Sequence, residues 1–179
     1  MDSGLLILRV VMGVLIAGHG VQKVSFRLGG GGLAGGTEEF RRDGFRGGAF
    51  TALVAGGSQI GAGLFLAAGL LTPAAAMVVM GVMTVAGSVK RHKGLWVQND
   101  GYEYPLMLVV TAAALALTGP GRWSLDRLIG LPEWPWWVSV AALVIGPGSG
   151  LLTRKVLRRP ADRGDKTEER TPPHAQAAG

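Results

Sequence analysis

The sequence predicts an all-α protein built as a bundle of membrane-spanning helices. Of its 179 residues, 48% are hydrophobic and only 17% are charged, whereas soluble domains carry roughly 25% charged residues. Five stretches approach the length of about 20 mostly apolar residues that a helix needs to cross a bilayer. Cysteine is absent, which excludes structural disulfides, thiolate metal sites and thiol-exchange chemistry by this chain alone.

The five candidate spans are Gly4–Gln22, Phe50–Leu71, Ala74–Val89, Pro105–Gly119 and Trp136–Leu152. The first could instead be a secretory signal peptide, but it begins with Asp2, has no basic residue at its start and no A-x-A cleavage pattern after it, which favours a permanent helix. The third and fourth are short, but Lys90 can extend to the interface, and Tyr102 and Tyr104 can lie among headgroups. In the fifth, residues 146–148 (Gly-Pro-Gly) predict a kink or a frayed end.

The lysines and arginines predict the orientation of the bundle. If all five segments cross, five basic residues fall in loop 23–49, three in loop 90–103 and seven in the tail at 153–179, all on one face. The other face carries Arg122 and Arg127. The positive-inside rule then places the N-terminus outside and the tail in the cytoplasm. An aromatic belt is expected at the outer interface, formed by Trp123, Trp134, Trp136 and Trp137.

Two ionisable residues fall within the first span. A charge such as Arg9 near mid-bilayer costs about 3 kcal/mol on insertion scales. Arg9 therefore either extends to the outer headgroups or pairs inside the bundle with a carbonyl, a water or a bound molecule, because no predicted span contains an acid. His19 is either a hydrogen-bonding link between helices or a proton-transfer group. Gln22 and Lys23 fit ordinary interfacial positions equally well.

Three polar stretches are predicted to emerge on one face, because successive spans cross in opposite directions. These stretches are residues 19–23, the glycine-rich loop 27–36 and the loop 96–105. Together they would collect a base, an acid, amides and phenols in a polar pocket. The candidate pocket residues are Arg9, His19, Gln22, Lys23, Gln59, Asn99, Tyr102, Glu103 and Tyr104. Glu103 precedes a span directly, so it either pairs with Lys23 or His19 or stabilises the start of the next helix as a negative charge.

The glycines predict close packing and turns more than ligand binding. The run Gly29–Gly32 lacks the lysine and serine of a P-loop and follows no strand, which argues against a nucleotide site. We expect Thr37 to cap a short interfacial helix that begins at Glu38. Gly57-x-x-x-Gly61 favours close helix packing, and Gln59 between them could face the same cavity as His19. No metal, flavin, haem or nucleic-acid motif is recognisable, and the net charge of +6 fits anionic lipids.

Five segments carry a resemblance to the DoxX family of small bacterial membrane proteins: LLILRVVMGVLIAGHGVQKV, GGGGLAGGTEEFRRDGF, GLLTPAAA, VQNDGYEYPLML and GPGRWSLDRLIG. The likeness covers residues 4–130 and is most specific at HGxQK and N-x-GYEYP. It implies a transmembrane four-helix bundle over residues 1–130 in the bacterial inner membrane. The family's motifs match at His19, Gln22, Lys23, Asn99, Tyr102, Glu103 and Tyr104. This chain departs from the pattern by an additional transmembrane helix at 131–152 and a charged, disordered tail at 153–179.

The resemblance implies a redox context, since relatives include subunits linked to thiosulfate:quinone oxidoreduction and members associated with a complex of superoxide dismutase and a sulfurtransferase. We expect an accessory or scaffolding subunit, not an enzyme on its own, with a pocket for a lipid or quinone. One alternative is a quinone-linked oxidoreductase subunit, in which His19 and Glu103 exchange protons while Tyr102 or Tyr104 orients the quinone. Another is a small-solute transporter, although no inverted repeat favours it. Expected partners are membrane lipids, redox-enzyme subunits and further copies of the chain, but no nucleic acid.

Overall fold

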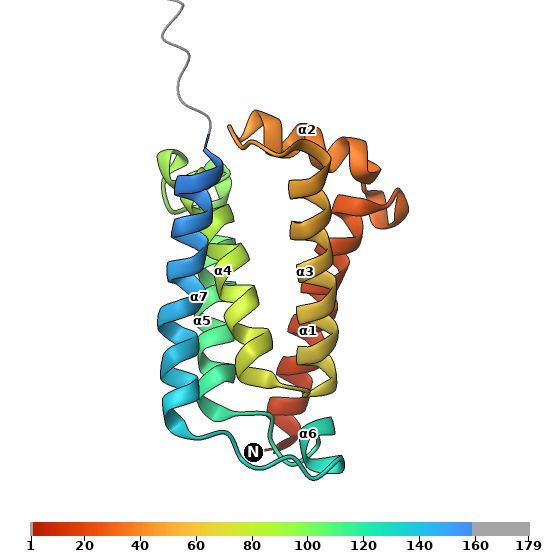
Figure 1. Cartoon of the computed structure of the whole chain (residues 1–179), viewed down its shortest axis with the longest axis vertical. Coiled ribbons are helices and arrows are strands. Elements are labelled where there is room, and N and C mark those ends of the chain that lie inside the picture. The colour runs from red at the N-terminus through yellow and green to blue at the C-terminus, as the bar shows by residue number, and fades with distance from the viewer. Residues whose placement is uncertain (1, 159–179) are drawn as a thin grey trace, which may run out of the picture.

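Five long helices run in alternating directions through the computed structural model, which describes residues 2–158 (Figure 1). They are α1 (Asp2–Val24), α3 (Gly48–Ala68), α4 (Thr72–Lys90), α5 (Glu103–Thr118) and α7 (Trp136–Leu157). The shorter elements are η1 (Arg27–Gly29), α2 (Gly32–Arg42), η2 (Arg91–Lys93), η3 (Val97–Asn99) and α6 (Leu125–Leu128). No β-strand forms within residues 2–158. The predicted all-α bundle is confirmed.

Four of these helices are long and apolar enough to cross a membrane: Asp2–Val24, Gly48–Ala68, Thr72–Lys93 and Trp136–Leu157. The fifth, α5, is apolar but has only 16 residues. The last helix continues through its glycine–proline–glycine stretch to Leu157, so it does not fray at the predicted place. Gly146 and Gly150 instead bring α7 against α4, where an added Cβ would lie 2.9 Å from the oxygen of Met77 and 2.4 Å from that of Gly81.

Helices α1 and α3 form a tight pair through facing glycines. A Cβ on Gly13 would lie 2.4 Å from the carbonyl oxygen of Gly63, and a Cβ on Gly20 would lie 2.5 Å from that of Gly56. The prediction that Gly57 and Gly61 form the packing surface is wrong, because a Cβ on either would meet nothing within 4 Å. The positions of α3 that meet the glycines of α1 are 56, 60, 63 and 67, so Gly57 and Gly61 each lie one position beyond this face.

The five helices form two groups, the α1–α3 pair and the trio of α4, α5 and α7 (Figure 1). A short connection between α3 and α4 joins the groups at one end. Near this end the two groups share a hydrophobic core that includes Met12 and Ile16 of α1, Leu66 of α3, Met80 of α4 and Leu115 of α5. Towards the other end, α3 and α4 diverge.

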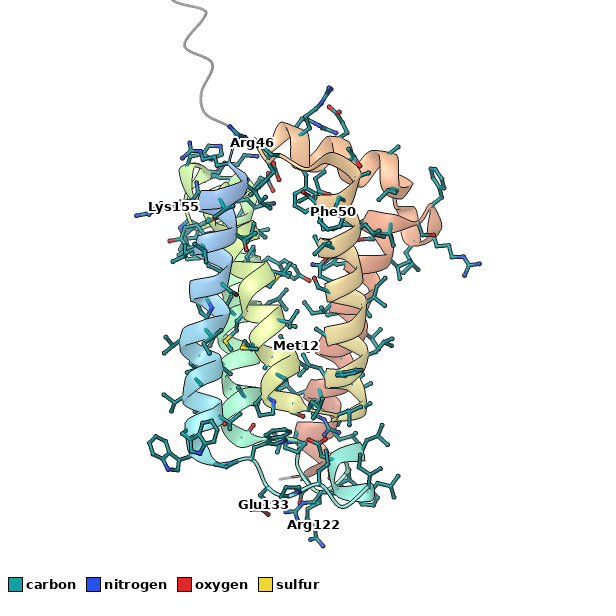
Figure 2. All side chains as sticks on the ribbon, viewed as in Figure 1. Met12, Arg46, Phe50, Arg122, Glu133 and Lys155 are labelled. Carbon is teal, nitrogen blue, oxygen red and sulfur yellow. The ribbon has the colours of Figure 1, made fainter. Side chains whose placement is uncertain are left out.

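That other end, which carries α2, η2 and η3, is here named the motif face. The N-terminus and α6 lie at the opposite end (Figure 1), so Gln22 and Asn99 share the motif face as predicted. Figure 2 shows Arg46 and Lys155 at the motif face and Arg122 at the opposite end. The direction of this axis in the membrane and the proposed domain limits stay predictions. Of the tail predicted at 153–179, the first five residues belong to α7, and residues 159–179 lie outside the described part of the chain.

Candidate functional site

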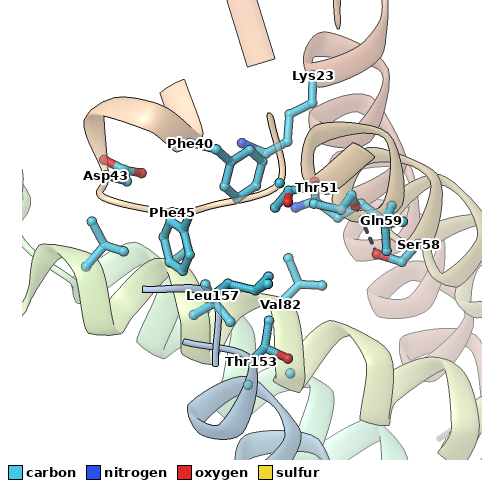
Figure 3. A pocket seen from close by; sticks show the side chains of 18 of the residues that line it. Lys23, Phe40, Asp43, Phe45, Thr51, Ser58, Gln59, Val82, Thr153 and Leu157 are labelled. Atoms are coloured by element: carbon cyan, nitrogen blue, oxygen red, sulfur yellow. Dashed lines mark hydrogen bonds between the residues drawn. The ribbon is translucent and has the colours of Figure 1, made fainter. Parts of the chain in front are cut away.

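A cavity of about 410 Å³ lies between the two helix groups, next to the motif face (Figure 3). Its walls come mainly from α3, α4 and α7 and are largely apolar, with Val54, Val78, Val82, Val85 and Leu157 among the lining residues. Its polar end is formed by Lys23, Glu39 and Asp43. Phe50 lines the cavity and is 73% exposed, so the cavity opens to the exterior beside Phe50.

Residues 43–47 form a strap from α2 across the motif-face end of the cavity. The backbone N–H of Arg46 donates to the carbonyl oxygen of Leu157 at 2.7 Å, and Phe45 forms an isolated antiparallel bridge with Arg158. Phe45 is buried and its ring meets that of Phe40 edge to face at 5.7 Å. The strap therefore ties the end of α2 to the end of α7.

Lys23 carries the positive charge of the cavity, and α2 neutralises it. The Lys23 ammonium lies 2.8 Å and 2.9 Å from the two carboxylate oxygens of Glu39 and 5.2 Å from the centre of the Phe40 ring. The predicted pairing of Lys23 with Glu103 is therefore wrong. Glu39 is available because α2 begins at Gly32, not at Glu38, and folds back over α1.

The start of α2 also corrects the prediction for Thr37. This residue lies inside the helix, where its hydroxyl donates to the carbonyl oxygen of Leu33 at 2.7 Å. The glycine-rich residues 32–36, which were predicted to lie outside the helix, form its first turns because they permit close packing. A Cβ on Gly36 would lie only 2.4 Å from the carbonyl oxygen of Lys23, so the contact with the end of α1 requires glycine.

Gln59 is the buried polar residue of the cavity wall. Its side chain is 3% exposed, and its amide oxygen has no hydrogen-bond partner within residues 2–158. Figure 3 shows it on α3 beside Ser58 and Thr51. Ser58 satisfies its own hydroxyl by donating to the carbonyl oxygen of Ala55 at 2.9 Å. The expectation that Gln59 shares a cavity with His19 is wrong, since His19 is not among the residues that line it.

His19 belongs to a separate chain of hydrogen bonds that ties α1 to α5. The Gln22 amide N–H donates to the carbonyl oxygen of Leu28 at 2.8 Å, so its amide oxygen faces His19 Nδ1 at 3.1 Å. An oxygen acceptor there requires the proton on Nδ1. In the neutral tautomer Nε2 accepts from the hydroxyl of Tyr104, 2.8 Å away. His19 thereby joins α1 to α5.

The loop between α4 and α5 folds on itself and holds the remaining motif residues apart from the cavity. The backbone N–H of Asn99 donates to the carbonyl oxygen of Trp96 at 3.1 Å, and the backbone N–H of Tyr102 donates to the carbonyl oxygen of Gly94 at 3.2 Å. The carboxylate of Glu103 accepts the N–H of Val97 at 3.0 Å. Glu103 is also the first residue of α5, which agrees with its alternative role as a negative charge at a helix start.

Two loop carboxyls have shifted pKa values. Hydrogen bonds from Lys90 and then Lys93 lower the pKa of Asp100 to about 2. Asp43, beside the cavity, behaves in the opposite way, because burial and the nearby Glu39 carboxylate raise its pKa. The motif-face end of the cavity therefore disfavours additional negative charge.

Arg9 lies at the opposite end of the bundle and does not join the other candidate residues. Its guanidinium is fully buried and donates to the carbonyl oxygens of Pro120 and Trp123. Of the alternatives for Arg9, pairing with carbonyls is the one observed. Buried Asp126 lies nearby and accepts hydrogen bonds from the N–H of Leu71 at 2.9 Å and from the indole of Trp134 at 3.1 Å. Arg9 and Asp126 thus fasten the loop after α5 to the base of the bundle.

Several cavity residues were not predicted from the sequence, notably Glu39, Asp43, Thr51 and Thr153. The amphipathic pattern of residues 32–42, with acids and bases on one side of a helix, was the available signal for Glu39. Within residues 2–158, no three His, Asp or Glu side chains lie together so as to hold a metal ion.

The model of the DoxX family matches residues 4–92. The matched range contains α1 to α4 and the HGxQK motif, and it ends before the loop that carries N-x-GYEYP. No curated protein and no solved structure matches the chain.

Proposed function

We propose that this chain, which belongs to the DoxX family, is an accessory membrane subunit that holds a lipid or a quinone for a membrane-associated redox complex. The chain is a multi-pass membrane protein. The observation that carries the proposal is the cavity of about 410 Å³, which falls within the range of roughly 300–1,000 Å³ of small-molecule sites. Its apolar walls suit a hydrocarbon chain, and its few polar side chains suit a headgroup.

The motif face supports the accessory role. It presents α2, the loop before α5 and most of the basic residues of the described chain. We place this face in the cytoplasm of a bacterium by the positive-inside rule. A soluble redox enzyme would then dock beside the polar end of the cavity.

A second candidate is a quinone-linked oxidoreductase subunit of the thiosulfate:quinone type. The hydrogen-bonded pair of Tyr104 and His19 favours it, because His19 Nε2 can accept the proton that Tyr104 relays. In this candidate the electrons come from a partner. Glu103 takes no part in the relay, since its carboxylate accepts the N–H of Val97.

The test is to purify the chain in mild detergent and to identify what accompanies it by native mass spectrometry and lipid extraction. Val82→Trp fills the cavity, and Val144→Trp adds the same side chain on the exposed side of α7. The proposal expects a stoichiometric lipid or quinone with the wild-type chain and with Val144→Trp, and its loss with Val82→Trp. Equal occupancy in all three chains would reject the cavity as the site.

Two further readouts separate the candidate functions. If the chain acts as an accessory subunit, redox enzymes co-purify with it and Tyr104→Phe leaves both the partner and the bound molecule in place. If it relays protons, Tyr104→Phe leaves binding unchanged but slows quinone reduction by the assembled complex. Absence of any redox partner together with solute flux in liposomes would instead support a transporter.

A further inference from the structure

Gln59 places a hydrogen-bonding group deep inside the apolar part of the cavity. It lies eleven residues beyond the start of α3, a rise of about 16 Å along the helix. At this depth water is scarce, and a buried acceptor without a donor is costly. The amide oxygen of Gln59 is such an acceptor within the described chain. The complementary group is a hydroxyl, and because the oxygen has almost no accessible surface, the hydroxyl meets it when the Gln59 side chain turns towards the cavity.

The charges of the cavity lining oppose an anionic occupant. Lys23 is the one cation among the described lining residues, and both oxygens of the Glu39 carboxylate already contact its ammonium. Asp43 adds a second acid at the same end, and its raised pKa, caused by burial and by Glu39, reflects how poorly this end tolerates negative charge. A phosphate group would meet two carboxylates and no free cation here.

A phospholipid satisfies these conditions poorly in either position. With its phosphate at the depth of Gln59, a charge would lie far from water, which is the most costly arrangement in a bilayer. With its phosphate at Lys23, only a hydrocarbon chain would reach Gln59, and the buried amide oxygen would stay without a donor.

Resting on the proposed function of the cavity, we infer that it selects an uncharged lipid alcohol, whose hydroxyl donates to the amide oxygen of Gln59 while its chain lies along Val54, Val78 and Val82. The shared chemistry is a neutral headgroup with a hydroxyl. Two membrane sources provide it, the glycerol hydroxyl of a diacylglycerol and the phenolic hydroxyl of a reduced quinone.

The experiment measures binding of four probes to the purified full-length chain by native mass spectrometry. The probes are dioctanoylglycerol, dioctanoylphosphatidic acid with the same chains, a decyl-substituted benzoquinol and its quinone. We expect one or both hydroxyl-bearing probes to bind about tenfold more tightly than phosphatidic acid. Which of the two binds identifies the source of the hydroxyl.

Two variants test the role of Gln59. Gln59→Leu removes the acceptor. It is expected to lower the affinity for the hydroxyl-bearing probe about fivefold to tenfold, which is the effect of one lost hydrogen bond. Gln98→Leu makes the same change at an exposed position in η3, outside the cavity, and is expected to leave binding unchanged. The inference is overturned if both variants lose affinity equally, or if Gln59→Leu loses none.

Glu39→Gln provides a test that does not depend on changing the interior. It frees the charge of Lys23, so the preference is expected to move towards phosphatidic acid. If phosphatidic acid binds the wild-type chain as tightly as the diacylglycerol does, the inference is overturned, but the proposal that the cavity binds a lipid is not. If no probe binds and nothing accompanies the purified chain, the proposed function itself fails.

Discussion

The contact between α1 and α3 allows a sharp prediction from a single added methyl group. In Gly63→Ala, the new Cβ would lie 2.5 Å from the carbonyl oxygen of Gly13 and 2.6 Å from the nitrogen of Ala17. Ordinary contact begins at 3.4 Å, so the helices must separate by about 1 Å, and both neighbours are backbone atoms that cannot turn aside. Overpacking of this kind costs about 1–3 kcal/mol.

Gly61→Ala supplies the matched control on the same helix. Its Cβ meets nothing within 4 Å, and alanine is favoured over glycine inside a helix by up to about 1 kcal/mol. The two variants have the same composition and differ only in the direction of the methyl group. The propensity gain is common to both variants, so the structure predicts that Gly61→Ala is about 1–3 kcal/mol more stable than Gly63→Ala, the cost of overpacking alone.

The assay is reversible unfolding of the purified chain by sodium dodecyl sulfate in mild detergent, followed by helical circular dichroism. The midpoint for Gly63→Ala should move to less denaturant than wild type, and the midpoint for Gly61→Ala should stay or move to more. Coincident curves, or the reverse order, would refute the assignment of the face of α3 that meets α1.

Three other outcomes follow from the described contacts. Hydrogen bonds from Lys90 and Lys93 lower the pKa of Asp100 from 3.8 to about 2. The stabilisation that these bonds give is fully present above about pH 4 and is lost as the pH falls to 2. Asp100→Asn should therefore flatten the acid limb of a plot of unfolding free energy against pH. Asp126→Ala leaves the N–H of Leu71 without its acceptor, and the unfolding free energy should drop by about 2 kcal/mol; an unchanged midpoint would contradict a fastening role. Since the chain has no cysteine, single cysteines can be labelled with a membrane-impermeant reagent: positions 22 and 99 should react from the same side and position 122 from the other, and labelling of 22 and 99 from opposite sides would rule out an odd number of crossings between them.

The sequence predicts the long helices well, because the length of an apolar run and the alternation of direction are local properties. The same logic places Gln22 and Asn99 at one end of the bundle. The start of α2 was predicted too late because glycine lowers helix propensity, whereas packing against α1 and α3 rewards the absence of a side chain. Helix propensity describes each residue without its tertiary neighbours, so it does not include this packing contribution.

The candidate site was predicted only in part, since its partners come from distant segments. Lys23 meets Glu39 only because α2 folds back over the end of α1, and a search restricted to the motifs favoured Glu103. Arg9 finds its acceptors in the loop after α5, more than a hundred residues away. The cavity itself arises from the divergence of α3 from α4, which hydropathy does not encode.

The strap from α2 to α7 affects the route by which a molecule can reach the cavity. A molecule that arrives from the aqueous phase at the motif face meets this crossing segment first, whereas one that diffuses within the leaflet can approach the opening beside Phe50. If the cavity is occupied as proposed, its loading therefore depends on how many such molecules each unit area of membrane contains, and solubility in water matters little. Enrichment of one leaflet in the right amphiphile would raise occupancy with no change in the total amount in the cell.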